Sequence, residues 1–240
     1  MKLLVSDFDG TYFTDLENLL KNNEKIHEFR KNGNLFMLSS GRSFTSLKKM
    51  CKKYNIEYDY LSCCDGSILY DKNDNLITKH ELNENILDEF LKLKELVNFD
   101  YIQYSYQDDY YKEYKDNNLI GLNIVVKNEL INNNFLKELK KLETKYLEYD
   151  FLIYTHDDTT FFCLKNKGIN KSSTINYLKK LLNLNLNDIY TIGDSENDYY
   201  MLKLFKGFYI GNPDDRIKNV SLKGYNMVKE LIEDIEKSGI

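Results

Sequence analysis

The sequence has no tryptophan, one proline and only four cysteines among its 240 residues. None of the cysteines belongs to a CxxC pair or has a nearby histidine partner, so neither a zinc site nor a disulfide framework is indicated. The four residues are Cys51, Cys63, Cys64 and Cys163. We expect them to be reduced thiols in the core of the protein.

Long apolar runs and blocks of basic residues are missing as well. No run approaches the roughly 18 apolar residues that a membrane span requires, and the N-terminus leads directly into a predicted strand, unlike a signal peptide. With a net charge of −5 and a sequence pI near 5.4, the chain is a poor candidate for binding nucleic acid or an anionic membrane. We therefore expect a cytoplasmic protein, and a monomer by default.

Strand and helix patterns alternate at both ends of the chain. Short apolar runs at residues 2–6 and 35–39 are typical of strands buried on both faces of a parallel sheet. Between them, a polar stretch with spaced apolar residues ends at Gly33, which indicates a helix. From about residue 79 the pattern changes to helices mixed with antiparallel strands, and later the alternation resumes.

This organisation predicts an α/β protein with two domains. Residues 1–78 and 164–240 would form a Rossmann-like core, which is a doubly wound parallel sheet with helices on both faces. Residues 79–163 would form a smaller α+β domain inserted into that core. Because ligands of such sheets bind at the carboxyl ends of the strands, polar residues at those ends are the candidate site.

Two aspartates follow the first predicted strand, in the stretch VSDFDGTYFT at residues 5–14. Asp7 and Asp9 are two residues apart, so on a strand their side chains point to the same side. Carboxylates placed in this way repel each other unless a cation or a shared proton relieves the repulsion. The stretch therefore indicates a metal site, or chemistry that needs two carboxylates.

Three further polar clusters occupy equivalent positions, each at the end of a predicted strand or the start of a helix. They are Ser40, Gly41 and Arg42; Lys171; and Asp194, Asn197 and Asp198. Lysine, hydroxyl and backbone N–H groups are suited to a phosphate dianion, and carboxylates with a loop carbonyl are suited to Mg²⁺. Together the clusters indicate phosphoryl chemistry, with Asp7 as nucleophile and Asp9 as acid and base.

The same residues carry a resemblance to a known family. DFDGT resembles the first motif, DxDGT, of the haloacid dehalogenase-like phosphatase superfamily, and SSGR, Lys171 in GINKSS and GDSENDYYM resemble its second, third and fourth motifs. The order, spacing and strand context agree over nearly the whole chain. Within the superfamily the sequence is similar to the Cof-type sugar and metabolite phosphatases, which carry an α/β cap at the position of residues 79–163.

The resemblance implies a role for each motif residue. Asp7 would attack phosphorus and bind Mg²⁺, Asp9 would be the acid and base and bind the metal through its carbonyl, and Asp194 would complete the metal site. The residues that would hold the phosphate are the Phe8 backbone, Ser40, Gly41, Lys171 and Asn197. Asp198 would support the metal site from behind its ligands.

Two positions leave alternatives open. The Cof-type group usually has NGA where this chain has Asp65, Gly66 and Ser67, and the acidic residue would either alter substrate contacts or keep the turn. Arg42 would either steady the phosphate loop from behind or pair with an acidic neighbour such as Asp65.

The leading hypothesis is a Mg²⁺-dependent phosphomonoesterase that acts on a small phosphorylated metabolite, such as a sugar phosphate, through a phospho-Asp7 intermediate. One alternative is a phosphomutase of the same superfamily, which returns the phosphoryl group to a sugar. Another is a non-catalytic metabolite sensor or a phospho-Asp receiver domain, although receiver domains are about half this length and have no cap.

Overall fold

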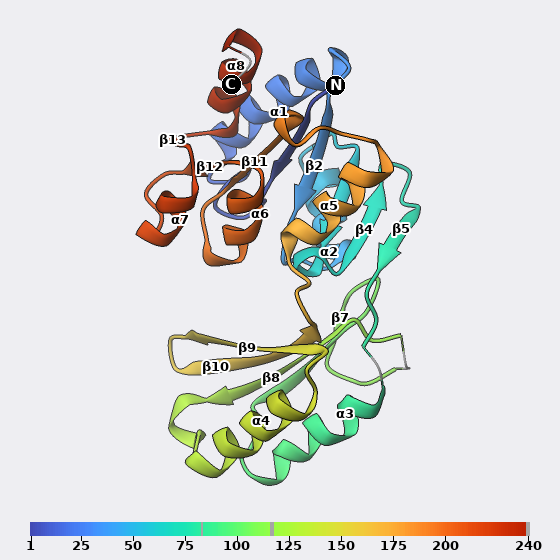
Figure 1. Ribbon diagram of the computed structural model, residues 1–240, viewed down its shortest axis with the longest axis vertical. Helices are drawn as coiled ribbons and strands as arrows, with labels where there is room; N and C mark the ends of the chain where they lie inside the picture. Colours follow the sequence, from blue (N-terminus) through green and yellow to red (C-terminus); the bar gives the residue numbers. More distant parts are fainter. Residues whose placement is uncertain (83, 116–117, 239–240) are drawn as a thin grey trace. The chain divides into compact units, whose positions relative to one another are not determined.

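The computed structural model describes residues 1–82, 84–115 and 118–238 (Figure 1). The chain divides into two compact units, of which the first is built from both ends of the sequence. This unit comprises residues 1–78 and 170–240, and the second comprises residues 79–169.

The return to the first unit lies later in the chain than the sequence analysis placed it. The predicted boundary at residue 164 falls inside strand β10 (Thr159–Asn166), which pairs with β9 (Tyr149–His156) as far as Asn166. A strand that is hydrogen-bonded along its whole length cannot be divided between two units, so the division follows Ile169.

The first unit is built on an eight-stranded sheet in the order β13-β12-β11-β1-β2-β3-β4-β5. The six strands from β13 to β3 run parallel, and β4 is antiparallel to β3. The bounds are β1 (Leu3–Ser6), β2 (Leu35–Ser39), β3 (Tyr60–Cys63), β4 (Ile68–Asp71), β5 (Leu76–Lys79), β11 (Ile189–Gly193), β12 (Lys206–Ile210) and β13 (Lys223–Tyr225). This topology confirms the predicted doubly wound α/β core.

Helices cover both faces of this sheet, which explains the continuous apolar runs in its central strands. Leu3 and Val5 of β1 belong to an apolar cluster with residues of α5, α6 and α7, while the intervening Leu4 is also fully buried. Helix α1 lies beside α8 and α5 beside α6 (Figure 1). The bounds are α1 (Leu16–Lys31), α2 (Phe44–Lys53), α5 (Lys171–Leu181), α6 (Tyr199–Leu204), α7 (Asp215–Val220) and α8 (Val228–Ser238).

The second unit is an α+β domain with an antiparallel sheet in the order β7-β6-β8-β10-β9. Its other elements are α3 (Glu84–Leu91), β6 (Tyr101–Ser105), β7 (Tyr110–Tyr111), β8 (Gly121–Lys127) and α4 (Asn133–Lys145). The core of this unit forms where Phe90 of α3 and Phe135 of α4 meet Ile124 and Phe162 of the sheet. In the part of the chain that the structure describes, no helix has the length and apolar character needed to cross a bilayer.

Gly66 and Gly33 provide a matched test of backbone packing in the first unit. Both have a left-handed φ, +88° and +80°, but a Cβ on Gly66 would lie 2.1 Å from the Asn170 carbonyl oxygen, whereas one on Gly33 would meet nothing within 4 Å. We expect Gly33→Ala to cost about 1 kcal/mol and Gly66→Ala roughly 3 kcal/mol of unfolding free energy, because only the latter adds a clash to the φ penalty. Urea denaturation measures both values, and equal losses would contradict this packing.

Candidate active site

The predicted site residues come together at the carboxyl edge of the parallel strands. Asp7 follows β1, and its backbone N–H donates to the Ile192 carbonyl of β11 at 3.0 Å. Ser40 follows β2, and its N–H donates to the Ser62 carbonyl of β3 at 2.9 Å. Each strand end is therefore fixed to its neighbour, so the side chains that follow these strands are held at one edge.

Lys171 lies at the centre of the cluster and is fully buried. Its Nζ donates to Asp7 Oδ1 and to Asp198 Oδ1, both at 2.6 Å. Asn170 caps the start of α5 and thereby fixes the backbone next to the lysine. Burial lowers the pKa of Lys171, but the charges of Asp198 and Asp7 outweigh burial and hold the pKa above its ordinary value. The ammonium is a permanent positive charge beside the predicted nucleophile.

The carboxylates around this lysine form a group that fits a divalent cation. Asp7, Asp194 and Asp198 each present an oxygen within 4.8 Å of the others. Asp7 Oδ2 is buried and has no hydrogen-bond partner among the described residues. Hard cations such as Mg²⁺ take carboxylate oxygens as ligands, so an orphaned buried oxygen next to a second carboxylate suits this ion.

Asp198 differs from the other two members of this group, because protein donors already occupy both of its oxygens. Oδ1 accepts from Lys171, while Oδ2 accepts from the backbone N–H groups of Asp194 and Ser195, each at 3.0 Å. Asp198 thus fixes the loop that carries Asp194. This geometry suits the supporting position that the resemblance implied for it better than a place among the direct ligands.

Thr11 is a member of the site that the sequence analysis did not single out. Its Oγ1 donates to Asp194 Oδ1 at 2.5 Å, and a Cβ on the preceding Gly10 would lie 2.5 Å from Asp194 Oδ2. In the DFDGT motif, the glycine therefore leaves space for the Asp194 carboxylate of the fourth motif, and the threonine donates a hydrogen bond to it. In the sequence, only the position of Gly10 and Thr11 within the DFDGT motif indicated that they contribute to the site.

Asp9 and Arg42 form an ion pair with two hydrogen bonds. The Nε and Nη2 atoms of Arg42 donate to the two carboxylate oxygens of Asp9, each at 2.7 Å, and the guanidinium lies 5.4 Å from the centre of the Phe8 ring. The structure thus pairs Arg42 with Asp9, an acidic neighbour that the sequence analysis had not named. The Asp9 side chain is 53% exposed, so the predicted acid and base lies on the open side of the cluster.

The remaining predicted phosphate ligands lie on two loops that are connected through the turn at Asp65. Asn197 Nδ2 donates to Asp65 Oδ1 at 3.0 Å, and the Asp65 backbone N–H donates to the Ser40 carbonyl at 3.1 Å. Ser40 is almost wholly buried, and its Oγ accepts from the Arg42 N–H at 3.2 Å. The turn at Asp65 therefore bridges the second and fourth motifs.

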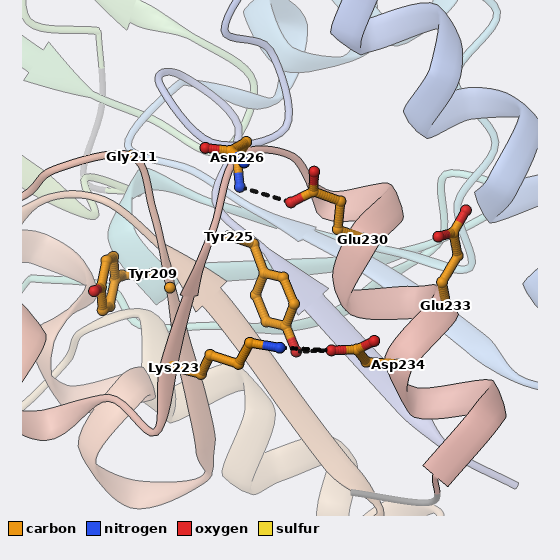
Figure 2. Close-up of a pocket in the computed structure, with 9 residues that line it drawn as sticks. Tyr209, Gly211, Lys223, Tyr225, Asn226, Glu230, Glu233 and Asp234 are labelled. Atoms are coloured by element: carbon orange, nitrogen blue, oxygen red, sulfur yellow. Dashed lines mark hydrogen bonds and ion pairs between the residues drawn. The ribbon is translucent and has the colours of Figure 1, made fainter.

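A cavity of about 480 Å³ in the same unit contains none of the predicted residues (Figure 2). It lies along β12, β13 and α8, where Asp234 accepts from Lys223 Nζ at 2.8 Å and from the Tyr225 hydroxyl at 2.9 Å. Its one lysine is thus paired with Asp234, and the other charged lining residues, Glu230 and Glu233, are acidic and unsuited to an anionic phosphate, so the strand-end cluster remains the candidate site.

Comparison with known proteins identifies the family of this chain. A family model for haloacid dehalogenase-like hydrolases matches residues 4–230. The chain belongs to this family, and within it to the Cof-type hydrolases. The resemblance predicted from the four motifs is therefore confirmed at the level of the family, and the protein is an enzyme of the hydrolase class.

Relatives match over most of their length at low identity. The chain is 24% identical to the 5-amino-6-(5-phospho-D-ribitylamino)uracil phosphatase YcsE of Bacillus subtilis over 227 residues, which cover 92% of this chain and 88% of the relative. It is also 24% identical to a putative phosphatase of Buchnera aphidicola subsp. Schizaphis graminum, with 90% and 86% covered.

Two solved structures illustrate the shared fold. A haloacid dehalogenase-like hydrolase from B. subtilis superposes with a TM-score of 0.78 at 16% identity, covering 99% of this chain and 100% of the other. A sugar phosphatase of subclass IIB of the same superfamily gives a TM-score of 0.72 at 14% identity, covering 98% and 99%. At these identities the likeness concerns the fold, and it confirms the predicted α/β architecture with its inserted domain.

The charge balance of the site leads to a pH-dependent stability. Burial raises the pKa of Asp7 from its ordinary 3.8 to about 8; Lys171 opposes the shift, and Asp198 and Asp194 add to it. Between about pH 4 and pH 8 the folded protein therefore binds the Asp7 proton more tightly than the unfolded chain does. Raising the pH through this interval then lowers the free energy of unfolding of the metal-free protein.

Asp7→Asn removes this contribution, so we expect the variant to be more stable than the wild type at pH 8, by about 1 to 3 kcal/mol, with a smaller gain near pH 5. Urea denaturation in the presence of a chelator measures the difference at each pH. Asp15→Asn, at an exposed helix cap where asparagine also caps, controls for the loss of a carboxylate. A gain for Asp7→Asn that stays constant or shrinks as the pH rises would contradict this account.

Proposed function

We propose that the protein is a Mg²⁺-dependent phosphomonoester hydrolase that acts on a small phosphorylated metabolite through a phospho-aspartyl intermediate at Asp7. The observation that carries the proposal is the buried Asp7 oxygen without a hydrogen-bond partner among the described residues, beside Lys171 and within reach of Asp194. A carboxylate oxygen that no protein donor occupies remains available to a metal ion or to phosphorus.

The first half of the reaction uses Asp7 as the nucleophile. An Asp7 oxygen attacks phosphorus, the bond to the ester oxygen breaks, and Asp9 gives its proton to that leaving oxygen. Lys171 orients Asp7 through its hydrogen bond to Oδ1, and its charge opposes the effect of burial on the pKa of this carboxyl group. Mg²⁺, held by Asp7, Asp194 and the Asp9 carbonyl, would supply positive charge that offsets the negative charge of the phosphoryl oxygens.

The second half returns the enzyme to its starting state. Asp9, now a carboxylate, takes a proton from a water molecule whose oxygen attacks the phosphorus of phospho-Asp7. The bond between phosphorus and Asp7 breaks and phosphate leaves. Ser40, Gly41, Asn197 and the Phe8 backbone would hold the phosphoryl oxygens during both steps. The net change is one ester and one water converted to one alcohol and one phosphate.

The substrate class is proposed from the relatives and from the two-unit organisation. Curated relatives are named phosphatases, and one of them carries a phosphorylated ribitylamino-uracil in its name. A subclass IIB structural neighbour is named a sugar phosphatase. These names support a small phosphorylated metabolite, sugar phosphates included. The second unit, residues 79–169, would act as the cap that selects the substrate.

Asp7→Asn provides the direct test of the covalent mechanism. We expect phosphate release from p-nitrophenyl phosphate, and from a panel of phosphorylated sugars, nucleotides and cofactors, to fall by about four orders of magnitude or more, because the amide cannot act as the nucleophile. A colorimetric phosphate assay with and without Mg²⁺ measures the effect, with Asp15→Asn as the control variant.

Two results would contradict the proposal. Turnover retained by Asp7→Asn would exclude the phospho-aspartyl intermediate, and full wild-type activity in a chelator would exclude the metal dependence. Conversion of a hexose 1-phosphate to its 6-phosphate without free phosphate would identify a phosphomutase instead of a hydrolase.

A further inference from the structure

The turn after β3 has an unusual backbone that restricts which residues it accepts. Cys64, Asp65 and Gly66 are three successive residues with left-handed φ values of 52°, 51° and 88°. Among residues other than glycine, asparagine and aspartate adopt this conformation most readily. Either residue would therefore serve the backbone at position 65, and the fold itself does not call for a negative charge there.

The Asp65 side chain lies among the residues proposed to hold phosphate. Its Oδ1 accepts from Asn197 Nδ2 at 3.0 Å, and the same oxygen lies 3.2 Å from the position that a Cβ on Gly41 would take. Its backbone N–H donates to the carbonyl of Ser40 at 3.1 Å. The carboxylate thus adjoins two of the proposed phosphate ligands, Asn197 and Gly41, and the backbone of Asp65 contacts a third, Ser40.

Asp65 also acts on the buried lysine. Burial lowers the pKa of Lys171, while Asp198, Asp7 and, in smaller measure, Asp65 raise it. A carboxylate offers only acceptor oxygens, so it cannot donate to phosphate and repels the dianion. The arrangement is the opposite of what the tightest phosphate binding would require.

We propose that Asp65 is a positioning residue that holds the amide of Asn197 and whose negative charge weakens the binding of inorganic phosphate, so that the product leaves the site readily. The inference rests on the proposed function, because it takes the pocket beside Asp65 to be the phosphate site. It assigns a role to the one motif position at which this chain carries an aspartate in place of the usual asparagine.

The test compares phosphate binding by the wild type and Asp65→Asn. The asparagine keeps the left-handed backbone and, through its carbonyl oxygen, the hydrogen bond from Asn197, so that mainly the charge is lost. We expect the variant to bind inorganic phosphate roughly three- to tenfold more tightly at low ionic strength, as measured by calorimetry in saturating Mg²⁺. The difference in affinity should shrink in about 0.5 M salt, because salt screens the repulsion between the carboxylate and phosphate. A purely structural effect of the substitution would not depend on salt in this way.

Asp74→Asn is the matched control. Asp74 also has a left-handed φ, of 65°, and its replacement changes the net charge by the same amount. Asp74 lies in the turn after β4, where its backbone N–H donates to the Asp71 carbonyl. Asp71 pairs with Tyr60 at the start of β3, whereas Asp65 follows the end of β3, so the two aspartates lie at opposite ends of this strand. We expect this variant to bind phosphate with the wild-type affinity.

Phosphate binding by Asp65→Asn that is equal to or weaker than that of the wild type would overturn the inference, as would an equal gain in Asp74→Asn. Asp65→Gly also accepts the backbone, but it removes both the charge and the acceptor for Asn197. It should therefore bind phosphate more weakly than Asp65→Asn, and equal affinities would contradict the positioning role. If none of the proteins binds phosphate or releases it from any ester, the proposed function fails and this inference fails with it. If the wild type binds phosphate as tightly as Asp65→Asn does, only the inference fails.

Discussion

The buried ammonium of Lys171 is the interaction on which the rest of the site depends. It donates to Asp7 and to Asp198, and Asp198 in turn holds the loop that carries Asp194. One cation thereby orders three carboxylates that would otherwise repel one another. The charge of Lys171 does not neutralise the three carboxylates, since burial still raises the pKa of Asp7 and of Asp194. The deficit of positive charge is the physical reason to expect a divalent cation at this site.

Close backbone approaches bring the two ends of the chain to this lysine. β1 pairs with β11 along its whole length, so the loops that carry Asp7 and Asp194 are neighbours although the two residues are 187 positions apart in the sequence. Gly10 makes room for Asp194, and Gly66 makes room for the start of α5. A side chain at Gly10 would displace Asp194, and one at Gly66 would displace the backbone at the start of α5. These glycines are therefore needed for packing, in addition to the residues of the motifs that are needed for chemistry.

The sequence predicted the family, the α/β class and the edge of the sheet where the candidate residues meet. Short apolar runs indicate buried parallel strands, and polar clusters that follow such strands lie together at their carboxyl ends. The sequence did not predict that Arg42 pairs with Asp9, that Thr11 donates to Asp194 or that Asp65 accepts from Asn197. Such pairings depend on how loops from different strands meet, which periodicity does not encode. The misplaced boundary at residue 164 has a similar cause, since the end of a strand depends on the length of its partner.

A crystal structure of the wild-type protein grown with Mg²⁺ tests the central claim most directly, because the claim concerns a shared cation. The account predicts one ion about 2.1 Å from a carboxylate oxygen of Asp7 and from one of Asp194, with the Lys171 ammonium still in contact with Asp7. An ion bound to only one of these aspartates, or a separation of the two carboxylates too large for both to reach the same ion, would contradict it.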